Sequence, residues 1–168
     1  MTDLPRDPTV LNTTVFSNFA HVDHVDLLVE LPRVVTVPAV ERELAEGAGT
    51  HSYLKHALAV LDQDIPVIAP SQSAQELEAE LLERLDPGEA QALAVALAAD
   101  GTVITDDGDA RTIAKQRGTT LTGSIGLLVR FVEAGQLSAE TADSYLSYWI
   151  DEGGFHSPAR DFETFLDG

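Results

Sequence analysis

The chain alternates short apolar segments with longer amphipathic ones, and this alternation constrains its fold more than any other feature. Strands are predicted at residues 9–11, 34–37, 66–68, 102–105 and 119–122. Helices are predicted at residues 13–20, 24–31, 38–47, 51–62, 72–85, 86–100, 108–117, 124–134 and 139–150. Because strands that alternate with helices pair in parallel and have both faces covered, the sequence predicts an α/β fold.

The length and composition predict one compact domain. A chain of 168 residues that is 44% hydrophobic buries roughly two thirds of the surface that its unfolded form exposes. We expect this domain to span residues 1–156, followed by a loosely attached tail at 157–168. The absence of cysteine excludes disulfides and thiolate metal sites. Without a leader pattern or a long apolar run, we expect a soluble cytoplasmic protein with no membrane partner.

The charge balance is strongly acidic, with 28 Asp and Glu against 10 Lys and Arg and a formal net charge of −18. Molar salt shortens the screening length to about 3 Å and suppresses such self-repulsion. We therefore expect a protein adapted to a salt-rich, halophilic cytoplasm. The sequence has no Lys/Arg cluster to release counterions from nucleic acid. Any nucleic acid must be held by a bridging metal ion, a few arginines or main-chain amides.

Polar side chains follow the predicted strands or begin the helices after them, where open α/β sheets bind ligands. These residues are Asn12, Glu43, Glu89, Asp106, Asp107 and Asp109. Several carboxylates in one place repel one another unless a cation or a shared proton compensates. The pattern therefore predicts a divalent-metal site.

Simpler structural roles are also open for the two glutamates. Asp86 and Glu89 have the spacing of a capping box, although Glu89 also heads the apolar face of its helix. Glu43 follows the apolar edge of its helix, whereas Glu41 and Glu46 belong to a solvated acidic face.

The three aspartates after residue 105 exceed the need of a helix N-cap, for which one is enough. Asp106 or Asp107 is expected to face the metal. Arg111 could pair with Asp107 at i,i+4 or hold a phosphate. Ser124, in a glycine-containing turn, could offer an amide to a phosphate. Asn12 could equally cap the first helix.

The order and spacing of these segments resemble the PIN-domain ribonucleases, most closely their branch of VapC-like predicted nucleic-acid-binding proteins. The similarity covers nearly the whole chain. It is carried by residues 10–19, 37–44, 85–93, 103–111 and 122–128.

The resemblance implies a three-layer α/β/α fold with a short parallel sheet, Mg²⁺- or Mn²⁺-dependent RNA cleavage and often a small antitoxin partner. It matches Asn12 to the family's first acid, Glu43 to the second, Glu89 to the third and Asp106 or Asp107 to the fourth. Asn12 departs from the family pattern, because the usual residue there is an aspartate that helps to anchor the metal.

These features favour a metal-dependent endoribonuclease. Glu43, Glu89 and Asp107 would hold one or two ions, Asp106 would assist, and Asn12 would orient water or the scissile phosphate. We expect Thr13, Arg111 and Ser124 to contact substrate.

The alternative is a non-catalytic PIN-like module that binds RNA or a partner protein. A phosphate-transferring α/β protein is less favoured, because the sequence has no P-loop. The apolar residues of 127–149 could form a homodimer surface or simply fill the core.

Overall fold

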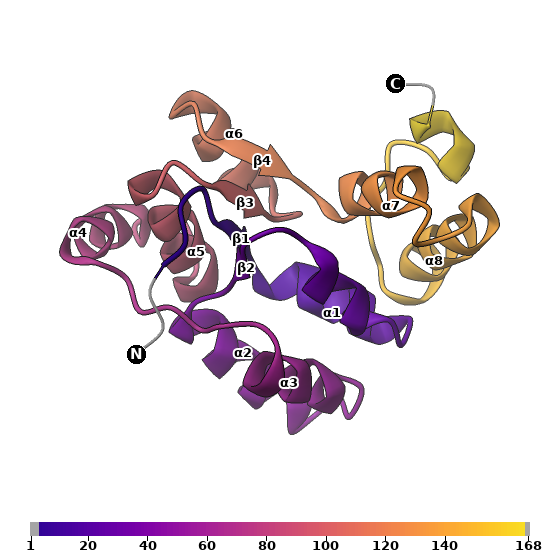
Figure 1. Ribbon diagram of the computed structural model, residues 1–168, viewed down its shortest axis with the longest axis horizontal. Helices are drawn as coiled ribbons and strands as arrows, with labels where there is room; N and C mark the ends of the chain where they lie inside the picture. Colours follow the sequence, from indigo (N-terminus) through magenta and orange to yellow (C-terminus); the bar gives the residue numbers. More distant parts are fainter. Residues whose placement is uncertain (1–3, 167–168) are drawn as a thin grey trace.

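Four short parallel strands form the centre of the protein in a computed structural model that describes residues 4–166 (Figure 1). Their order in the sheet is β2-β1-β3-β4. The strands are β1 (Thr9–Leu11), β2 (Val34–Val35), β3 (Thr102–Ile104) and β4 (Thr120–Thr122). The predicted α/β fold with a parallel sheet flanked by helices is confirmed. The predicted strand at residues 66–68 is reduced to one bridge, between Thr36 and Val67.

The helices follow the predicted order with shifted ends. They are α1 (Thr13–His21), α2 (Pro38–Ala48), α3 (Leu54–Gln63), α4 (Gln72–Leu81), α5 (Pro87–Ala98), α6 (Gly108–Gln116), α7 (Ser124–Glu133) and α8 (Ala139–Glu152), with the 3-10 helices η1 (Val25–Glu30) and η2 (Phe162–Phe165). The helix expected over residues 72–85 ends at Leu81, because the chain turns there before Asp86 caps α5.

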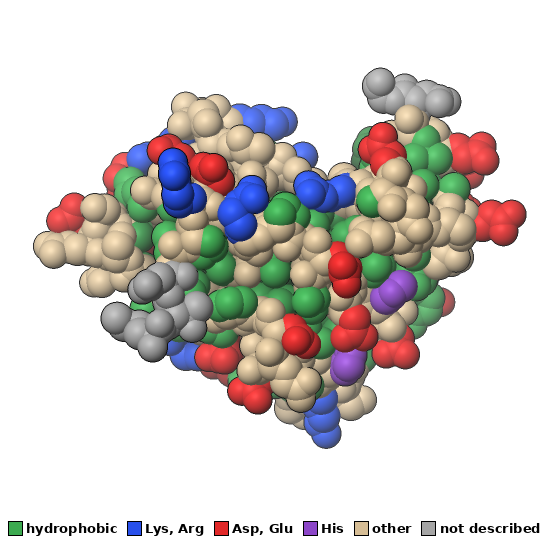
Figure 2. Space-filling model, in the orientation of Figure 1, with side chains coloured by type: hydrophobic (Ala, Val, Ile, Leu, Met, Phe, Trp, Pro, Cys, Tyr) green, Lys and Arg blue, Asp and Glu red, His purple; other side chains and the backbone are tan. Residues whose placement is uncertain are grey.

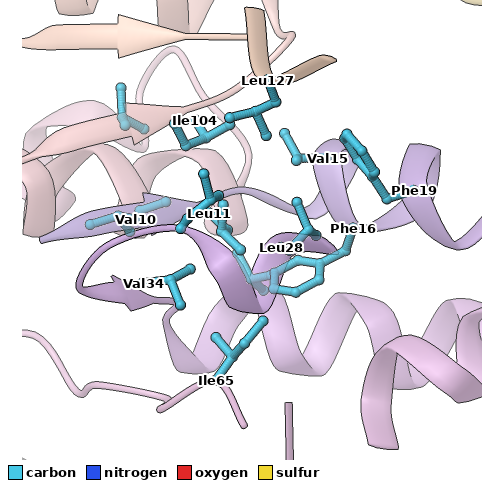
Figure 3. Packing of buried hydrophobic residues seen from close by; sticks show 14 of the residues in the cluster. Val10, Leu11, Val15, Phe16, Phe19, Leu28, Val34, Ile65, Ile104 and Leu127 are labelled. Carbon is cyan, nitrogen blue, oxygen red and sulfur yellow. The ribbon is translucent and has the colours of Figure 1, made fainter. Parts of the chain in front are cut away.

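Helices and turns cover both faces of the sheet. On one face, α5 packs against β1 and β3, and α6 packs beside it near β4. On the other face, Leu11 and Ile104 pack with Leu28 of η1 and Leu127 of α7, as Figure 3 shows. All four side chains are buried. This packing fixes the carboxyl ends of β1 and β3, where the predicted site residues begin.

An aromatic cluster joins α1 to α7 and α8. The ring centroid of Phe19 lies 6.0 Å from that of Phe131 and 5.3 Å from that of Trp149, both edge to face. Trp149 also donates a hydrogen bond from Nε1 to the Asn18 carbonyl at 2.7 Å. Leu127, Leu128, Phe131 and Trp149 are buried, while Tyr148 is 42% exposed. The C-terminal apolar residues thus mainly fill the core of this chain.

The segment after α8 folds back onto the domain. Phe162 is fully buried, and its backbone N–H donates to Asp143 Oδ1 at 2.9 Å. The described part of the segment predicted as a loose tail is therefore packed against α8. The domain boundary at residue 156 stays a prediction.

The surface has few ion pairs for its charge. Within residues 4–166 the ion pairs are His56–Asp26, Arg117–Glu80 and Arg160–Asp151. All three join partly or largely exposed side chains, so they add little stability. None of the helices in this part of the chain is long and apolar enough to cross a membrane.

Candidate active site

A cleft of about 890 Å³ opens beside the carboxyl ends of β3 and β4. One wall comes from Asp106, Asp107 and Arg111 at the start of α6. The opposite wall comes from α7 and from residues 153–156, 158 and 165. Figure 2 shows an indentation in the outline of the molecule between these two walls. In Figure 1, one wall belongs to the part formed by α6 and β4, and the other belongs to the part formed by α7 and the C-terminal segment. Of the predicted site acids, Asp106 and Asp107 line this cleft, and Glu43 and Glu89 do not.

Asn12 lies at the end of β1 and links two neighbouring elements. Its Oδ1 accepts a hydrogen bond from the Thr13 N–H at 2.8 Å, so it caps α1. Its Nδ2 donates to Thr105 Oγ1 at 2.9 Å, and the same hydroxyl accepts from the Asp107 N–H at 3.1 Å. Asn12 is 1% exposed. Its amide therefore fixes the backbone that carries Asp107, and it is not open to the cleft.

Glu43 reaches from α2 to the first turn of α5. Its Oε1 accepts from Thr13 Oγ1 at 2.5 Å, and its Oε2 accepts from the Gly88 N–H at 2.8 Å. A Cβ at Gly88 would collide with the Glu43 carboxylate, so glycine permits this close approach. The positive end of the helix dipole favours an anion here. Both carboxylate oxygens of Glu43, and the Thr13 hydroxyl, are thus engaged by the protein itself.

Glu89 completes the predicted capping box. Its N–H donates to Asp86 Oδ1 at 2.9 Å, and its Oε2 accepts from the Asp86 N–H at 3.4 Å. Burial, followed by the charges of Asp86 and Asp107, raises the pKa of Glu89 to about 8. The long hydrogen bond does not offset that penalty. Glu89 is therefore a carboxyl group whose charge lacks a cationic partner among the described residues.

Asp106 is held in a different way. Its Oδ1 accepts from the Ser124 N–H at 2.7 Å, and its Oδ2 accepts from Ser124 Oγ at 2.5 Å and from Asn18 Nδ2 at 3.1 Å. Burial raises the pKa of Asp106, and these hydrogen bonds and the Arg111 charge lower it in part. Ser124 is fully buried. Asp106 therefore joins β3 to the start of α7 with both oxygens occupied.

Gly123 allows Arg111 to approach Asp106. A Cβ at Gly123 would lie 2.8 Å from Asp106 Oδ1 and 2.9 Å from an Arg111 terminal nitrogen. Arg111 also donates from that nitrogen to the Thr105 carbonyl at 3.2 Å. Of the residues predicted to contact substrate, Arg111 lines the cleft, whereas Thr13 and Ser124 are bonded to Glu43 and Asp106.

The donor set determines whether a metal ion fits. Within residues 4–166, no three Asp, Glu, His or Cys side chains are close enough to hold one ion. One oxygen of Glu89 and one of Asp107 accept no hydrogen bond from this part of the chain. Carboxylate oxygens are the donors that Mg²⁺ and Mn²⁺ prefer, and Mg²⁺ often takes one or two and keeps its waters. Glu89 and Asp107 each supply a free oxygen of this type, whereas both oxygens of Glu43 already accept a hydrogen bond from the protein.

Sequence reasoning missed three polar residues, two in α1 and one directly after β3. Thr105 joins Asn12 to Asp107, and Asn18 joins Asp106 to Ser124. The Thr14 hydroxyl is buried and has no hydrogen-bond partner among the described residues, although Thr14 lines the cleft. Thr14 and Asn18 stand four residues apart on α1, which places them on one face of this helix. That spacing was the available signal. Asp109 is exposed in the first turn of α6.

The C-terminal wall of the cleft was also not predicted. Phe155, His156 and Phe165 line it. The Phe155 ring lies 5.7 Å from the Trp149 ring, and its N–H donates to the Trp149 carbonyl at 2.9 Å. Gly154 has a φ of +68°, which allows the chain to turn back after α8. This wall depends on long-range packing that no local pattern encodes.

Comparison with known proteins identifies the class of this fold and site. Residues 8–167 match the PIN-domain family, and the chain belongs to that family. PIN domains are typically nucleases that use divalent metal ions. A similar solved structure is described as VapBC2 from Rickettsia felis bound to a DNA fragment from their promoter. The match has a TM-score of 0.51 and 16% identity and covers 68% of this chain and 97% of that chain. No curated protein matches the chain.

Proposed function

We propose that this protein is a metal-dependent endoribonuclease of the VapC-toxin type that hydrolyses RNA phosphodiesters. The observation that carries the proposal is the pair Glu89 and Asp107: each keeps a carboxylate oxygen that accepts no hydrogen bond, and neither has an ion-pair partner, among the described residues. After burial and Asp86, the charge of Asp107 also raises the pKa of Glu89. Asp107 also lines the cleft. A divalent cation would remove this repulsion, and RNA phosphates commonly accompany such ions.

Each residue of the site has a proposed task. A bound Mg²⁺ or Mn²⁺ would lower the pKa of an attacking water and offset charge on the phosphate. Glu89 and Asp107 would hold the ion by their free oxygens. Asn12 acts through Thr105 as a positioning residue, because both are bonded to the segment that carries Asp107. Glu43 positions the start of α5, and Asp106 positions Ser124 and Arg111.

The substrate contacts would come from the cleft. Arg111 is its basic side chain, and one of its bonds, to the Thr105 carbonyl, fixes its direction. Guanidinium groups bind phosphate oxygens with good geometry. The unpartnered Thr14 hydroxyl supplies a further donor. An antitoxin partner is part of the same proposal, and it would act by covering this cleft.

A non-catalytic PIN-like module is the second candidate, and one observation favours it. The position matched to the family's first acid is an amide whose two polar atoms both serve the fold. Both oxygens of Glu43 and of Asp106 also accept hydrogen bonds from the protein, so Glu89 and Asp107 are the predicted site acids that keep an oxygen without one. Such a pocket could bind RNA without cutting it.

Cleavage of RNA at molar KCl with Mn²⁺ separates the two candidates. The comparison uses the unaltered chain, Asn12→Asp, Glu89→Gln and, as a control, Asp109→Asn. A nuclease should cut RNA only with metal and lose cleavage with Glu89→Gln. Asn12→Asp should slow cleavage, because it removes the Nδ2 donor that holds Thr105 and, through Thr105, the segment that carries Asp107. Asp109→Asn should change nothing.

The binding module predicts another set of results. Asn12→Asp would then lower stability through repulsion among neighbouring acids and create no activity. If neither the unaltered chain nor Asn12→Asp hydrolyses RNA, and Mn²⁺ stabilises neither protein, the nuclease assignment is wrong.

A further inference from the structure

A second hollow, of about 220 Å³, lies on the sheet face opposite α5. Its floor includes Thr9 of β1 and Thr102 of β3, which are directly paired in the sheet. Thr102 is paired in turn with Thr120 on the edge strand β4. Side chains at paired positions of adjacent strands share one face. A row of threonine side chains therefore crosses this face of the sheet.

Two arginines border this hollow, and no acidic residue in the described part of the chain lines it. Arg33 comes from the turn before β2, and Arg130 comes from α7. Both side chains are exposed, and neither forms an ion pair within residues 4–166. The chain has only 10 Lys and Arg against 28 Asp and Glu. Figure 2 shows several basic side chains over the upper middle of the face that it presents. We call the hollow lined by Arg33 and Arg130 the arginine groove.

Local backbone structure directs Arg33 toward its position. Arg33 has a φ of +53°, and Asp7 has a φ of +48°. Arg33 Nε donates to the Asp7 carbonyl at 2.9 Å. That bond uses the Nε–H and leaves the two terminal nitrogens of the guanidinium for an anion, since a guanidinium carries five donors. The terminal nitrogens are the part that binds phosphate oxygens in pairs.

The arginine groove continues into the cleft. Thr122 and Gly126 line both hollows. Gly126 is exposed, and a Cβ there would lie 2.6 Å from Thr122 Cγ2. Because Gly126 has no side chain, α7 can lie close to β4, and no side chain at this position separates the two hollows. A strand that occupies the cleft can therefore pass over Thr122 and Gly126 to reach the arginines.

We propose that the arginine groove binds the phosphodiester backbone of an RNA strand that extends from the cleft. The inference rests on the proposed function for the identity of the polyanion. An anionic chain bound to so acidic a protein needs the few cations available. Here two of them border a hollow that no acid of the described residues lines. Continuity with the cleft favours RNA over an acidic protein segment or a second copy of this chain.

Binding of non-cleavable RNA tests the proposal without requiring catalysis. The probe is a labelled 2′-O-methyl oligoribonucleotide, in a short form that fills only the cleft and a long form that reaches the groove. Binding is measured by fluorescence anisotropy over a range of KCl concentrations. The variant Arg33→Gln/Arg130→Gln should bind the long form about tenfold more weakly, with a salt slope smaller by roughly 1.4, as expected for two lost phosphate contacts. The short form should bind equally to both proteins.

Two controls separate charge from folding. Arg42→Gln/Arg84→Gln removes two exposed arginines elsewhere and should leave both affinities unchanged. Arg130→Lys keeps the positive charge and should retain most of the affinity for the long form. Melting temperatures of all variants identify any that have lost the fold.

Each failure has a distinct reading. If the groove variant binds the long form with unchanged affinity and salt slope, the groove is not on the RNA path, whatever the cleavage assay shows. If it changes the oligomeric state instead, the groove is an interface between copies and the proposal is wrong. If the unaltered chain binds no RNA, both proposals fail. If arginine-dependent binding occurs without cleavage in Mn²⁺, the groove stands and the nuclease assignment falls.

Discussion

Asp106 and Glu89 are both carboxylates at the carboxyl end of one sheet, yet the protein treats them in opposite ways. Asp106 accepts hydrogen bonds from the Ser124 N–H, the Ser124 hydroxyl and Asn18. Glu89 accepts one long bond from the Asp86 N–H and is repelled by Asp86 and Asp107. A carboxylate that accepts several hydrogen bonds from the protein stabilises the fold. A carboxylate that accepts few has oxygens available to a ligand. The number of acids near a site therefore matters less than the number of free oxygens.

Salt concentration tests this comparison at the scale of the whole surface. The net charge is −18, and most acids within residues 4–166 resemble Glu89 in having no ion-pair partner. Lowering KCl from molar to tens of millimolar lengthens the screening distance from about 3 Å toward 30 Å. We expect the melting temperature to fall steeply and the chain to expand or unfold. An unchanged melting temperature over that range would contradict the predicted adaptation to high salt.

Removal of the saturated carboxylate should have the largest effect of any single substitution. Asp106→Ala leaves the buried N–H and hydroxyl of Ser124 without their acceptor and removes one of the two acceptors of the Asn18 amide. It should therefore lower the free energy of unfolding by about 3 kcal/mol. Denaturant unfolding measures this. Asp109→Asn, at an exposed acid nearby, should change it by less than about 0.5 kcal/mol. Equal effects of the two substitutions would contradict a structural role for Asp106.

The close approach at Gly123 can be tested by adding one methyl group. Gly123→Ala should lower the free energy of unfolding by about 2 kcal/mol, because the new Cβ would meet Asp106 Oδ1 and Arg111. Gly108→Ala is the matched control, since a Cβ there meets nothing within 4 Å. The control should be neutral or slightly stabilising in a helix. A neutral Gly123→Ala would mean that Asp106 and Arg111 are not held together.

The pH dependence of the metal-free protein tests the environment of Glu89, the second carboxylate of the comparison. The pKa of Glu89 is raised from 4.5 to about 8 in the folded protein, so the folded state binds the proton more tightly than the unfolded state. Its contribution to stability is complete below pH 4.5 and is lost as pH rises through 8. Because the carboxyl group is half exposed, we expect this titration to change the free energy of unfolding by about 1 kcal/mol.

Glu89→Gln should remove that part of the pH dependence and should stabilise the metal-free protein at pH 8. Urea unfolding at several pH values between 4.5 and 8.5 measures the change. Glu76→Gln, at an exposed glutamate of α4, is the control. A pH profile identical in Glu89→Gln and the unaltered chain would show that Glu89 is an ordinary cap.

The sequence predicted the fold because its signals were local and repeated. Strands β1 and β3, and the Asp86 cap of α5, follow from hydrophobic pattern and capping residues that act over a few positions. The strand predicted at residues 66–68 failed because its pairing is limited to Thr36 and Val67. Whether a short apolar segment becomes a strand depends on neighbours distant in sequence.

The sequence predicted which residue types lie at the site, but it did not predict the hydrogen bonds that hold them. Asn12, Glu43 and Asp106 were expected near a ligand, whereas each is bonded to the protein by partners such as Thr105, Gly88 and Asn18. Those partners lie 93, 45 and 88 residues away in sequence, so no local pattern identifies them. The roles of the site residues stay predictions.

Thermal unfolding with and without Mn²⁺ tests most directly whether Glu89 and Asp107 form a cation site. At molar KCl, Mn²⁺ at about 100 times its dissociation constant should stabilise the unaltered chain by about 2.7 kcal/mol, which raises the melting temperature by about 5–10 °C. Glu89→Gln and Asp107→Asn should each lose most of that increment, and Asp109→Asn should keep it. An equal increment in all four proteins, or none in the unaltered chain, would contradict the account.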